Sequence, residues 1–107
     1  MNKFAETPSP PYYAVIFTTI QSDARDGYDE MSERMLDLAQ KEKGFLGIES
    51  ARGEIGLSVT YWASLEDIAR WKNHAEHKIA QAKGFEMWYK AFATRVAKVE
   101  VDSFFER

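Results

Sequence analysis

The 107-residue sequence contains no cysteine and only two histidines, and these absences exclude several kinds of site. Without cysteine there are no disulfides, no thiolate catalysis and no cysteine-based metal centres, which suits a reducing compartment. The two histidines, His74 and His77, stand three residues apart with no recognised metal-ligand spacing around them, so we expect no metal site. No elbow-type serine motif accompanies them, and the six glycines are isolated from one another, so a catalytic triad and a phosphate-binding glycine loop are also excluded.

Long apolar runs and clusters of basic residues are missing as well. The longest apolar run, "YYAVIF" at residues 12–17, is far too short to span a membrane, and the N-terminus lacks the pattern of an export signal. The formal net charge is −3, with lysines and arginines scattered between acids. We therefore expect no membrane contact, no nucleic-acid partner and a cytoplasmic location.

Aromatic residues, in contrast, are abundant at 14% of the chain, with seven Phe, five Tyr and three Trp. Such an excess is typical of a ligand pocket or an interface. The length allows one domain. Prolines at positions 8, 10 and 11 oppose regular structure, so we predict a flexible N-terminal arm over residues 1–11 and a single domain over residues 12–107.

Hydrophobic periodicity predicts six elements in the domain. "YYAVIFTTI" predicts a strand over about residues 12–20 with apolar side chains on both faces, and "YDEMSERMLDLAQKEKG" predicts a helix that stops at Gly44. Two strands follow as a hairpin around "RGEIG". Ser64, with acids at the next positions, caps a second helix that we expect to run to about Lys83. A short amphipathic segment, "FEMWYKAF", then precedes a closing strand, "TRVAKVEVDSFF", over residues 94–105.

The order β-α-β-β-α-β is that of a ferredoxin-like α+β fold, with a four-stranded antiparallel sheet and both helices on one face. Two helices cover only one side of such a sheet. The first strand is apolar on both sides, so the second face needs cover, and a second copy across a two-fold axis supplies it most simply. We therefore predict a homodimer.

The stretch "TYWASLEDIARWKNHAEHKIAQAKG", residues 60–84, holds the candidate site. At helical spacing one apolar stripe includes Trp71 and faces the sheet, His74 stands one turn away at its rim, and His77 lies further round. Trp62 ends the preceding strand and can wall the space between helix and sheet. Each of these residues also has an ordinary structural explanation, because a tryptophan on such a stripe often only fills the core and a rim histidine often only makes surface hydrogen bonds.

Trp62, Ser64, Glu66 and Trp71 in "TYWASLEDIARW" resemble the strand-to-helix signature of the antibiotic biosynthesis monooxygenase family. The resemblance extends by pattern over roughly residues 12–105. It implies a dimeric α+β barrel with a pocket between helices and sheet in each subunit. Some members of this family are thought to oxidise polycyclic phenols with O₂ and neither metal nor flavin, and others resemble haem-degrading monooxygenases. The resemblance therefore implies one of these two activities.

Haem degradation is the less well supported of these two activities. Trp71 matches the porphyrin-facing tryptophan of the haem-degrading enzymes, but Gln81 stands where their iron-ligating histidine would be. Strand 1 has no asparagine, the residue that supports their oxygen chemistry. Gln81 is a poor iron ligand compared with imidazole, so haem remains an alternative only if His74 or His77 takes over.

The resemblance and the helical geometry together favour a cofactor-independent monooxygenase that acts on a small aromatic phenol or quinol. His74 would be the base that ionises the substrate, with Trp71 as the second catalytic residue. The expected substrate-binding residues are Trp62 and Phe17 as walls, and Tyr13, Tyr61 and Asn73 as hydrogen-bonding groups. A non-catalytic dimer that binds a small ligand is the competing hypothesis, because a fold does not fix a function.

Overall fold

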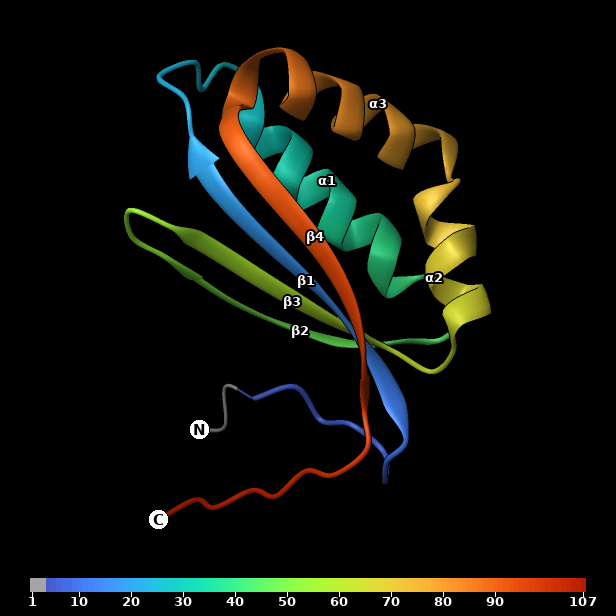
Figure 1. Cartoon of the computed structure of the whole chain (residues 1–107). Coiled ribbons are helices and arrows are strands. Elements are labelled where there is room, and N and C mark those ends of the chain that lie inside the picture. The colour runs from blue at the N-terminus through green and yellow to red at the C-terminus, as the bar shows by residue number, and fades with distance from the viewer. Residues whose placement is uncertain (1–3) are drawn as a thin grey trace.

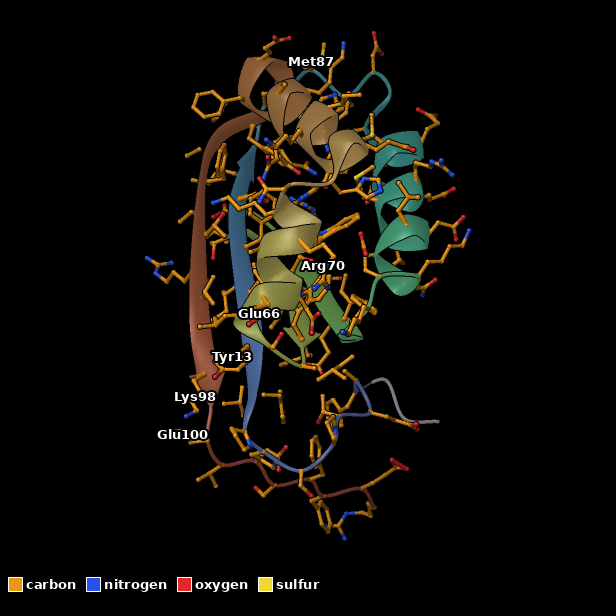
Figure 2. The ribbon with its side chains drawn as sticks, turned by 90° about the vertical axis from the view of Figure 1, so that its right-hand side faces the viewer. Tyr13, Glu66, Arg70, Met87, Lys98 and Glu100 are labelled. Carbon is orange, nitrogen blue, oxygen red and sulfur yellow. The ribbon has the colours of Figure 1, made fainter. Side chains whose placement is uncertain are left out.

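The computed structural model describes residues 4–107 and has the ferredoxin-like α+β fold predicted from the sequence (Figure 1). The elements are β1 (Tyr12–Gln21), α1 (Tyr28–Gln40), β2 (Phe45–Arg52), β3 (Gly56–Trp62), α2 (Leu65–Lys72), α3 (Ala75–Lys83), the π-helical turn η1 (Gly84–Trp88) and β4 (Tyr89–Val99). The four strands form one antiparallel sheet in the order β2-β3-β1-β4. All the helices lie on one side of it (Figure 2).

The strand registers assign each side chain to one of two faces. Tyr13 of β1 lies opposite Trp62 of β3, and Phe17 lies opposite Ser58. Trp62 stacks with Trp71 of α2, so this set of alternating residues forms the helix-covered face. The other set, which includes Tyr12 and Tyr61, forms the helix-free face. Trp62 is fully buried at the end of β3 where α2 begins, and Trp88 of η1 is buried beyond the far end of β1, so the core is not confined to one end of the sheet.

The sequence predicted one helix from Ser64 to Lys83, and this prediction is wrong at Asn73 and His74. There the chain forms two helices, α2 and α3. The amide nitrogen of Asn73 donates to the Ala69 carbonyl oxygen at 2.9 Å, and the Nδ1 of His74 accepts from the backbone N–H of Glu76 at 3.2 Å. Polar side chains that bond nearby backbone groups compete with helical hydrogen bonds, which explains why α2 ends and α3 begins here.

The predicted bounds of the last strand are also wrong. β4 begins at Tyr89 instead of Thr94 and ends at Val99 instead of Phe105. Most of the segment predicted to precede the strand therefore belongs to η1 and β4. β4 pairs with β1 along nearly its whole length, from Tyr12 opposite Val99 to Gln21 opposite Tyr89, and this long-range pairing overrides the local pattern that suggested a separate segment.

The chain segments before β1 and after β4 cross the helix-free face. The backbone N–H of Ala5 donates to Glu49 of β2 at 2.9 Å, and the Tyr12 hydroxyl donates to Asp102 at 2.7 Å. The first three residues of the predicted arm lie outside the described residues, and the flexibility of the rest stays a prediction. The arms cover the half of the helix-free face around Tyr12 and Tyr61. Within residues 4–107, every helix is too short or too polar for a transmembrane span.

Candidate functional site

Aromatic rings from four elements contact one another where α2 meets the sheet. The Trp62 ring lies edge-on to Phe45 at 5.3 Å between centroids and stacks with Trp71 at 6.4 Å. Trp71 also stacks nearly parallel with His77 of α3, with centroids 4.6 Å apart and 14° between the planes. The Trp62 indole nitrogen donates to Thr60 at 2.9 Å, so its one polar atom is satisfied. This arrangement fixes the His77 imidazole against a rigid aromatic support.

The hydrogen bond of His77 defines which of its two ring nitrogens carries the proton. Nδ1 lies 3.1 Å from the Trp71 carbonyl oxygen. A carbonyl can only accept, so Nδ1 is the protonated nitrogen and Nε2 has a free lone pair in the neutral ring. Burial lowers the pKa of His77, and the Trp71 carbonyl only partly offsets this effect. His77 is therefore neutral at pH 7 and can accept a proton at Nε2, where no residue of the described chain makes a hydrogen bond.

His74, the base favoured by the sequence, is engaged in a structural role. Its Nδ1 caps α3 by accepting from the Glu76 N–H, and its ring lies tilted against Trp71 at 5.4 Å. Glu76 in turn makes a two-pronged ion pair with Arg34 of α1, at 2.9 and 3.0 Å. These contacts hold the start of α3 against α1 and keep the stacked histidine in place.

Of the remaining predicted site residues, Tyr13 lies directly opposite Trp62, whereas the others are engaged elsewhere. Tyr13 and Phe17 lie on the helix-covered face, but Phe17 packs against Tyr89 and Phe92, each at 5.6 Å between centroids. Tyr61 points to the helix-free face, where its hydroxyl donates to Glu49 at 2.8 Å, so it cannot serve a site at Trp71. Asn73 bonds the backbone of its own helix. The structure thus brings together Trp62, Tyr13, Trp71, His74 and, beyond the expected set, His77 as a candidate base.

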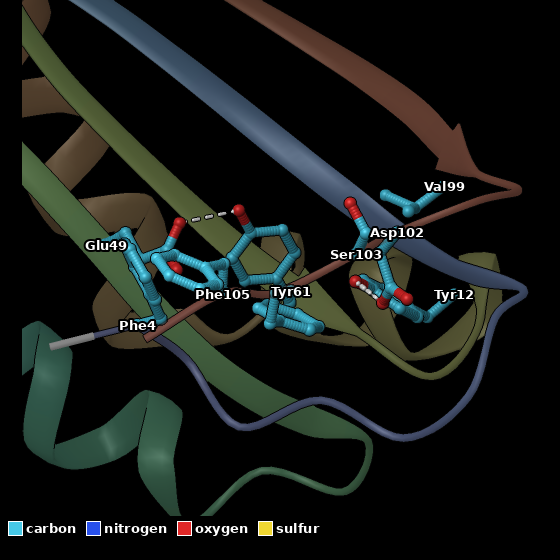
Figure 3. Close-up of a pocket in the computed structure, with 9 residues that line it drawn as sticks. Phe4, Tyr12, Glu49, Tyr61, Val99, Asp102, Ser103 and Phe105 are labelled. Atoms are coloured by element: carbon cyan, nitrogen blue, oxygen red, sulfur yellow. Dashed lines mark hydrogen bonds between the residues drawn. The ribbon is translucent and has the colours of Figure 1, made fainter. Parts of the chain in front are cut away.

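A cavity of about 390 Å³ lies on the helix-free face under the two chain arms (Figure 3). Tyr12 and Tyr61 line it, and their rings meet edge-on at 5.8 Å. Burial, followed by the Glu49 carboxylate, raises the pKa of Tyr61 to about 12, so its hydroxyl stays protonated. The sequence did not predict this cavity, because its walls include Phe4 from the predicted flexible arm and Phe104 and Phe105 from a segment predicted as strand.

Asp67 is the buried acidic group of α2 and belongs to the helix cap rather than to the site. Its backbone N–H donates to the Ser64 hydroxyl at 3.1 Å, and the same hydroxyl donates to the Asp67 carboxylate at 2.8 Å. This reciprocal arrangement confirms the cap predicted from the sequence. Arg70 binds the other carboxylate oxygen at 2.7 Å. The Arg70 guanidinium, aided by Ser64, holds the pKa of Asp67 below its usual range, against the opposing effect of burial.

Asp67→Asn is expected to lower the free energy of unfolding at pH 7 by about 1 kcal/mol, because it removes a charge-assisted bond to a partly exposed arginine. A depressed pKa contributes stability above the unfolded-state value and loses it as the pH falls through the folded-state value. The difference between wild type and variant should therefore shrink below about pH 4. Urea unfolding at pH 7 and pH 3 measures it, with Asp23→Asn in an exposed loop as control. A difference that is constant with pH would contradict the assignment.

Among residues 4–107 no three His, Cys, Asp or Glu side chains are grouped so that they could hold a metal ion. The chemical capacity of the site therefore lies in the stacked rings and the imidazole of His77. An electron-rich aromatic ligand fits such surroundings, because aromatic rings contact one another favourably face to edge or in offset stacks.

Comparisons with known proteins give a matching family model and a relative in sequence. The family model described as antibiotic biosynthesis monooxygenase matches residues 11–83. A Bacillus subtilis (strain 168) protein named "Uncharacterized protein YqjZ" is 45% identical over 108 residues, which cover 99% of this chain and 95% of that protein.

Solved structures show the same fold. The structure of Rv0793 from Mycobacterium tuberculosis matches with a TM-score of 0.74 at 16% identity, covering 86% of this chain and 97% of that one. A conserved protein from Methanosarcina mazei Go1 matches with a TM-score of 0.72 at 11% identity, covering 81% and 91%. At these identities the likeness extends to the fold alone.

Proposed function

Because the chain belongs to the antibiotic biosynthesis monooxygenase family, we propose that it oxidises a small electron-rich phenol with O₂ and without a bound cofactor. A phenol and one O₂ give a quinone and one water. One oxygen atom enters the ring, the other leaves as water, and the four electrons that reduce O₂ come from the phenol itself. The protein then has to bind the phenol, remove its proton and exclude bulk water.

The observation that carries this proposal is the free Nε2 lone pair of His77. The Nδ1–H bond to the Trp71 carbonyl fixes the ring, and burial keeps the ring neutral at pH 7. A neutral imidazole in this orientation can take the phenolic proton and make the phenolate, the form that reacts with O₂. The resulting imidazolium can return the proton to the departing oxygen atom. His77 replaces His74 as the proposed base, because the Nδ1 lone pair of His74 already caps α3.

Exposed apolar side chains on α2 and α3, the helices that carry Trp71 and His77, support a surface for an aromatic ligand. Leu65 and Ile79 belong to the helical stripe that the sequence predicted to face the sheet, yet both are more than half exposed. Trp71 is half-buried between these helices and the sheet. An aromatic ligand that covered either of these exposed side chains would remove apolar surface from water at about 25 cal/mol per Å².

Haem degradation is the second hypothesis, and the residues fit it less well. The side chain of Gln81, at the position of the family's iron ligand, is exposed on α3. His77 has the bond to a carbonyl that metal-ligating histidines often make, but it lies flat on Trp71.

The proposal is tested by incubating the protein with 1-naphthol and O₂. We expect one O₂ consumed per 1,4-naphthoquinone formed, with one labelled oxygen in the quinone when ¹⁸O₂ is supplied. Parallel titrations follow tryptophan quenching by naphthol and the Soret band of added haem. Tryptophan quenching without oxygen uptake would contradict the proposal and indicate a non-catalytic ligand-binding module. A Soret shift without naphthol turnover would favour the haem hypothesis.

We further propose that the protein is a homodimer that pairs through the part of the helix-free face beyond the chain arms. Ile20 of β1 and Leu57 of β3 lie on this part with 45% and 41% of their surfaces exposed. A second copy related by a two-fold axis would cover the same residues on both chains. This pairing leaves the helices of each subunit accessible to substrate.

Leu57→Lys is expected to convert the dimer to a monomer, because it places a charge in the centre of the proposed apolar contact. Light scattering after size exclusion measures the mass, which should fall from about twice the 12.3 kDa chain to the mass of one chain. Leu65→Lys, at an exposed leucine on α2, is the matched control and should stay dimeric. A wild-type protein that is monomeric at high micromolar concentration would contradict the proposal.

A further inference from the structure

At the end of β1 that lies away from the chain arms, two arginines stand close together without an acidic partner. The Gln21 side-chain oxygen accepts from Arg25 at 2.8 Å and from Arg52 at 3.2 Å, in the amide orientation that gives both guanidiniums an acceptor. Within residues 4–107 neither guanidinium has a carboxylate oxygen within 4.0 Å. Arg25 also donates to the Trp88 carbonyl oxygen at 3.1 Å and lies 4.0 Å from the centroid of the Tyr28 ring. All these partners are uncharged, so the positive charge of the two guanidiniums stays uncompensated.

Gly56 makes room for the Arg52 side chain across the sheet. A Cβ at Gly56 would lie 2.2 Å from the Arg52 Nη1 and 2.6 Å from the Thr19 Oγ1. Arg52 pairs with Gly56, Gly56 with Thr19, and Thr19 with Phe92, so these four residues form one row across the strands. Arg52 reaches over β3 to Thr19, where Nη1 lies 3.4 Å from the hydroxyl. Its head group is therefore about one strand spacing, roughly 5 Å, from the strand that carries Phe92.

Hydrogen-bond donors exceed acceptors around these arginines. The Tyr28 hydroxyl lies 3.2 Å from Arg52 Nη2 and 3.4 Å from the Tyr89 hydroxyl. The two tyrosines carry two hydroxyl hydrogens, and only one can be used in the bond between them. The second hydroxyl hydrogen has no acceptor among the described residues. Burial, with the adjacent Tyr28, raises the pKa of Tyr89, so its hydroxyl remains protonated. A ligand that only accepts hydrogen bonds would satisfy this surplus.

Aromatic rings adjoin the donors on the same face of the sheet. Phe17, Tyr89 and Phe92 contact one another with centroids 5.6 to 6.0 Å apart. Phe92 keeps 42% of its surface exposed beside this group. An aromatic ring placed on Phe92 would bury apolar surface on both partners and extend the cluster with the same edge or offset geometry.

We propose that these six residues, Arg25, Arg52, Tyr28, Tyr89, Phe17 and Phe92, form a binding site for an aromatic carboxylate. The carboxylate accepts from the guanidinium of Arg52 and from the Tyr28 hydroxyl, whose hydrogen is free because Tyr89 donates to it, while the ring of the ligand packs on Phe92. Guanidinium and carboxylate match in shape and charge, which gives such contacts about twice the strength of neutral hydrogen bonds. This arginine–aromatic site does not depend on the proposed oxygenation, because binding alone defines it.

The test compares two ligands of nearly equal shape, 2-naphthoate and 2-naphthamide, by calorimetric titration of the full chain under argon. We expect 2-naphthoate to bind at least about 10-fold more tightly, since only the carboxylate is an anion that accepts at both oxygens. Arg52→Gln should weaken 2-naphthoate binding at least about 10-fold and leave 2-naphthamide binding unchanged. The matched control, Arg95→Gln, removes an exposed arginine of β4 on the helix-free face and should change neither Kd by more than about twofold.

Gly56→Ala gives an independent reading, because it keeps both arginines but fills the space where the Arg52 guanidinium lies. We expect it to weaken 2-naphthoate binding as Arg52→Gln does. Equal affinities for the two naphthalene ligands, equal effects of Arg52→Gln and Arg95→Gln, or no binding of 2-naphthoate to the wild type at millimolar concentration would each overturn the proposal. Displacement of 2-naphthoate by inorganic phosphate at an equal concentration would also overturn it, since the rings would then contribute nothing.

Discussion

His77→Phe is expected to lower kcat/KM for 1-naphthol oxidation at least about 100-fold, the usual cost of removing a general base. Phenylalanine keeps a flat ring to stack on Trp71 but has no lone pair to accept the phenolic proton. The initial rate of oxygen uptake measures the effect. In the wild type, kcat/KM should fall as the pH drops through the lowered pKa of His77, because protonation occupies the accepting nitrogen. This acid limb should be absent from the residual activity of His77→Phe.

His74→Asn is the matched control for this result. Asparagine is a good helix cap and can replace the bond that His74 makes to the Glu76 N–H. We expect kcat/KM to stay within about threefold of wild type, since the variant preserves α3 and leaves His77 untouched. If His74→Asn abolished oxygen uptake while His77→Phe did not, His74 would be the base, as the sequence first indicated.

Gly44→Ala is expected to destabilise the protein by about 2 to 4 kcal/mol, the range associated with backbone strain combined with loss of a buried polar contact. Gly44 ends the loop after α1 with a φ of +85°, a conformation that disfavours any side chain. Its Cβ would lie 2.0 Å from a carboxylate oxygen of Asp67. The new methyl group would therefore displace Asp67 from Ser64 and Arg70 and loosen the start of α2. Urea unfolding at pH 7 measures the loss.

Gly53→Ala provides the comparison for Gly44→Ala. Gly53 lies in the β2–β3 turn, where an added Cβ would meet nothing within 4 Å and φ is not in the left-handed range. Its effect on the free energy of unfolding should stay within about 0.5 kcal/mol. Equal stability of the two variants would show that the close approach of Gly44 to Asp67 does not constrain the fold.

The sequence correctly predicted the elements whose boundaries depend on residues only a few positions apart. The β2–β3 hairpin and the start of α2 at Ser64 are as expected, because turn residues and a capping hydroxyl act over a few positions. The extent of β4 could not be predicted in this way. Its first residue, Tyr89, lies opposite Gln21, and that pairing depends on the whole sheet.

The candidate site was predictable to the level of which helix and strand supply it. Trp62 and Trp71 meet as expected, because each lies on the apolar side of its own element. The choice between His74 and His77 was not predictable from helical spacing, since the helix breaks at Asn73 and the angular relation between the histidines changes. The arginine–aromatic site needed the register, which places Arg52, Gly56, Thr19 and Phe92 in one row although they are distant in sequence.

The position of the two chain arms has a practical consequence for handling the protein. Segments 4–11 and 100–107 both leave the sheet at the end where β1 begins and β4 stops, on the side opposite the helices (Figure 1). An affinity tag or fusion partner at either terminus would therefore emerge next to the surface proposed for subunit pairing. Tags should therefore be removed by proteolysis before mass measurements. Immobilisation through a terminus, in contrast, would leave the helices with His74 and His77 facing the solvent.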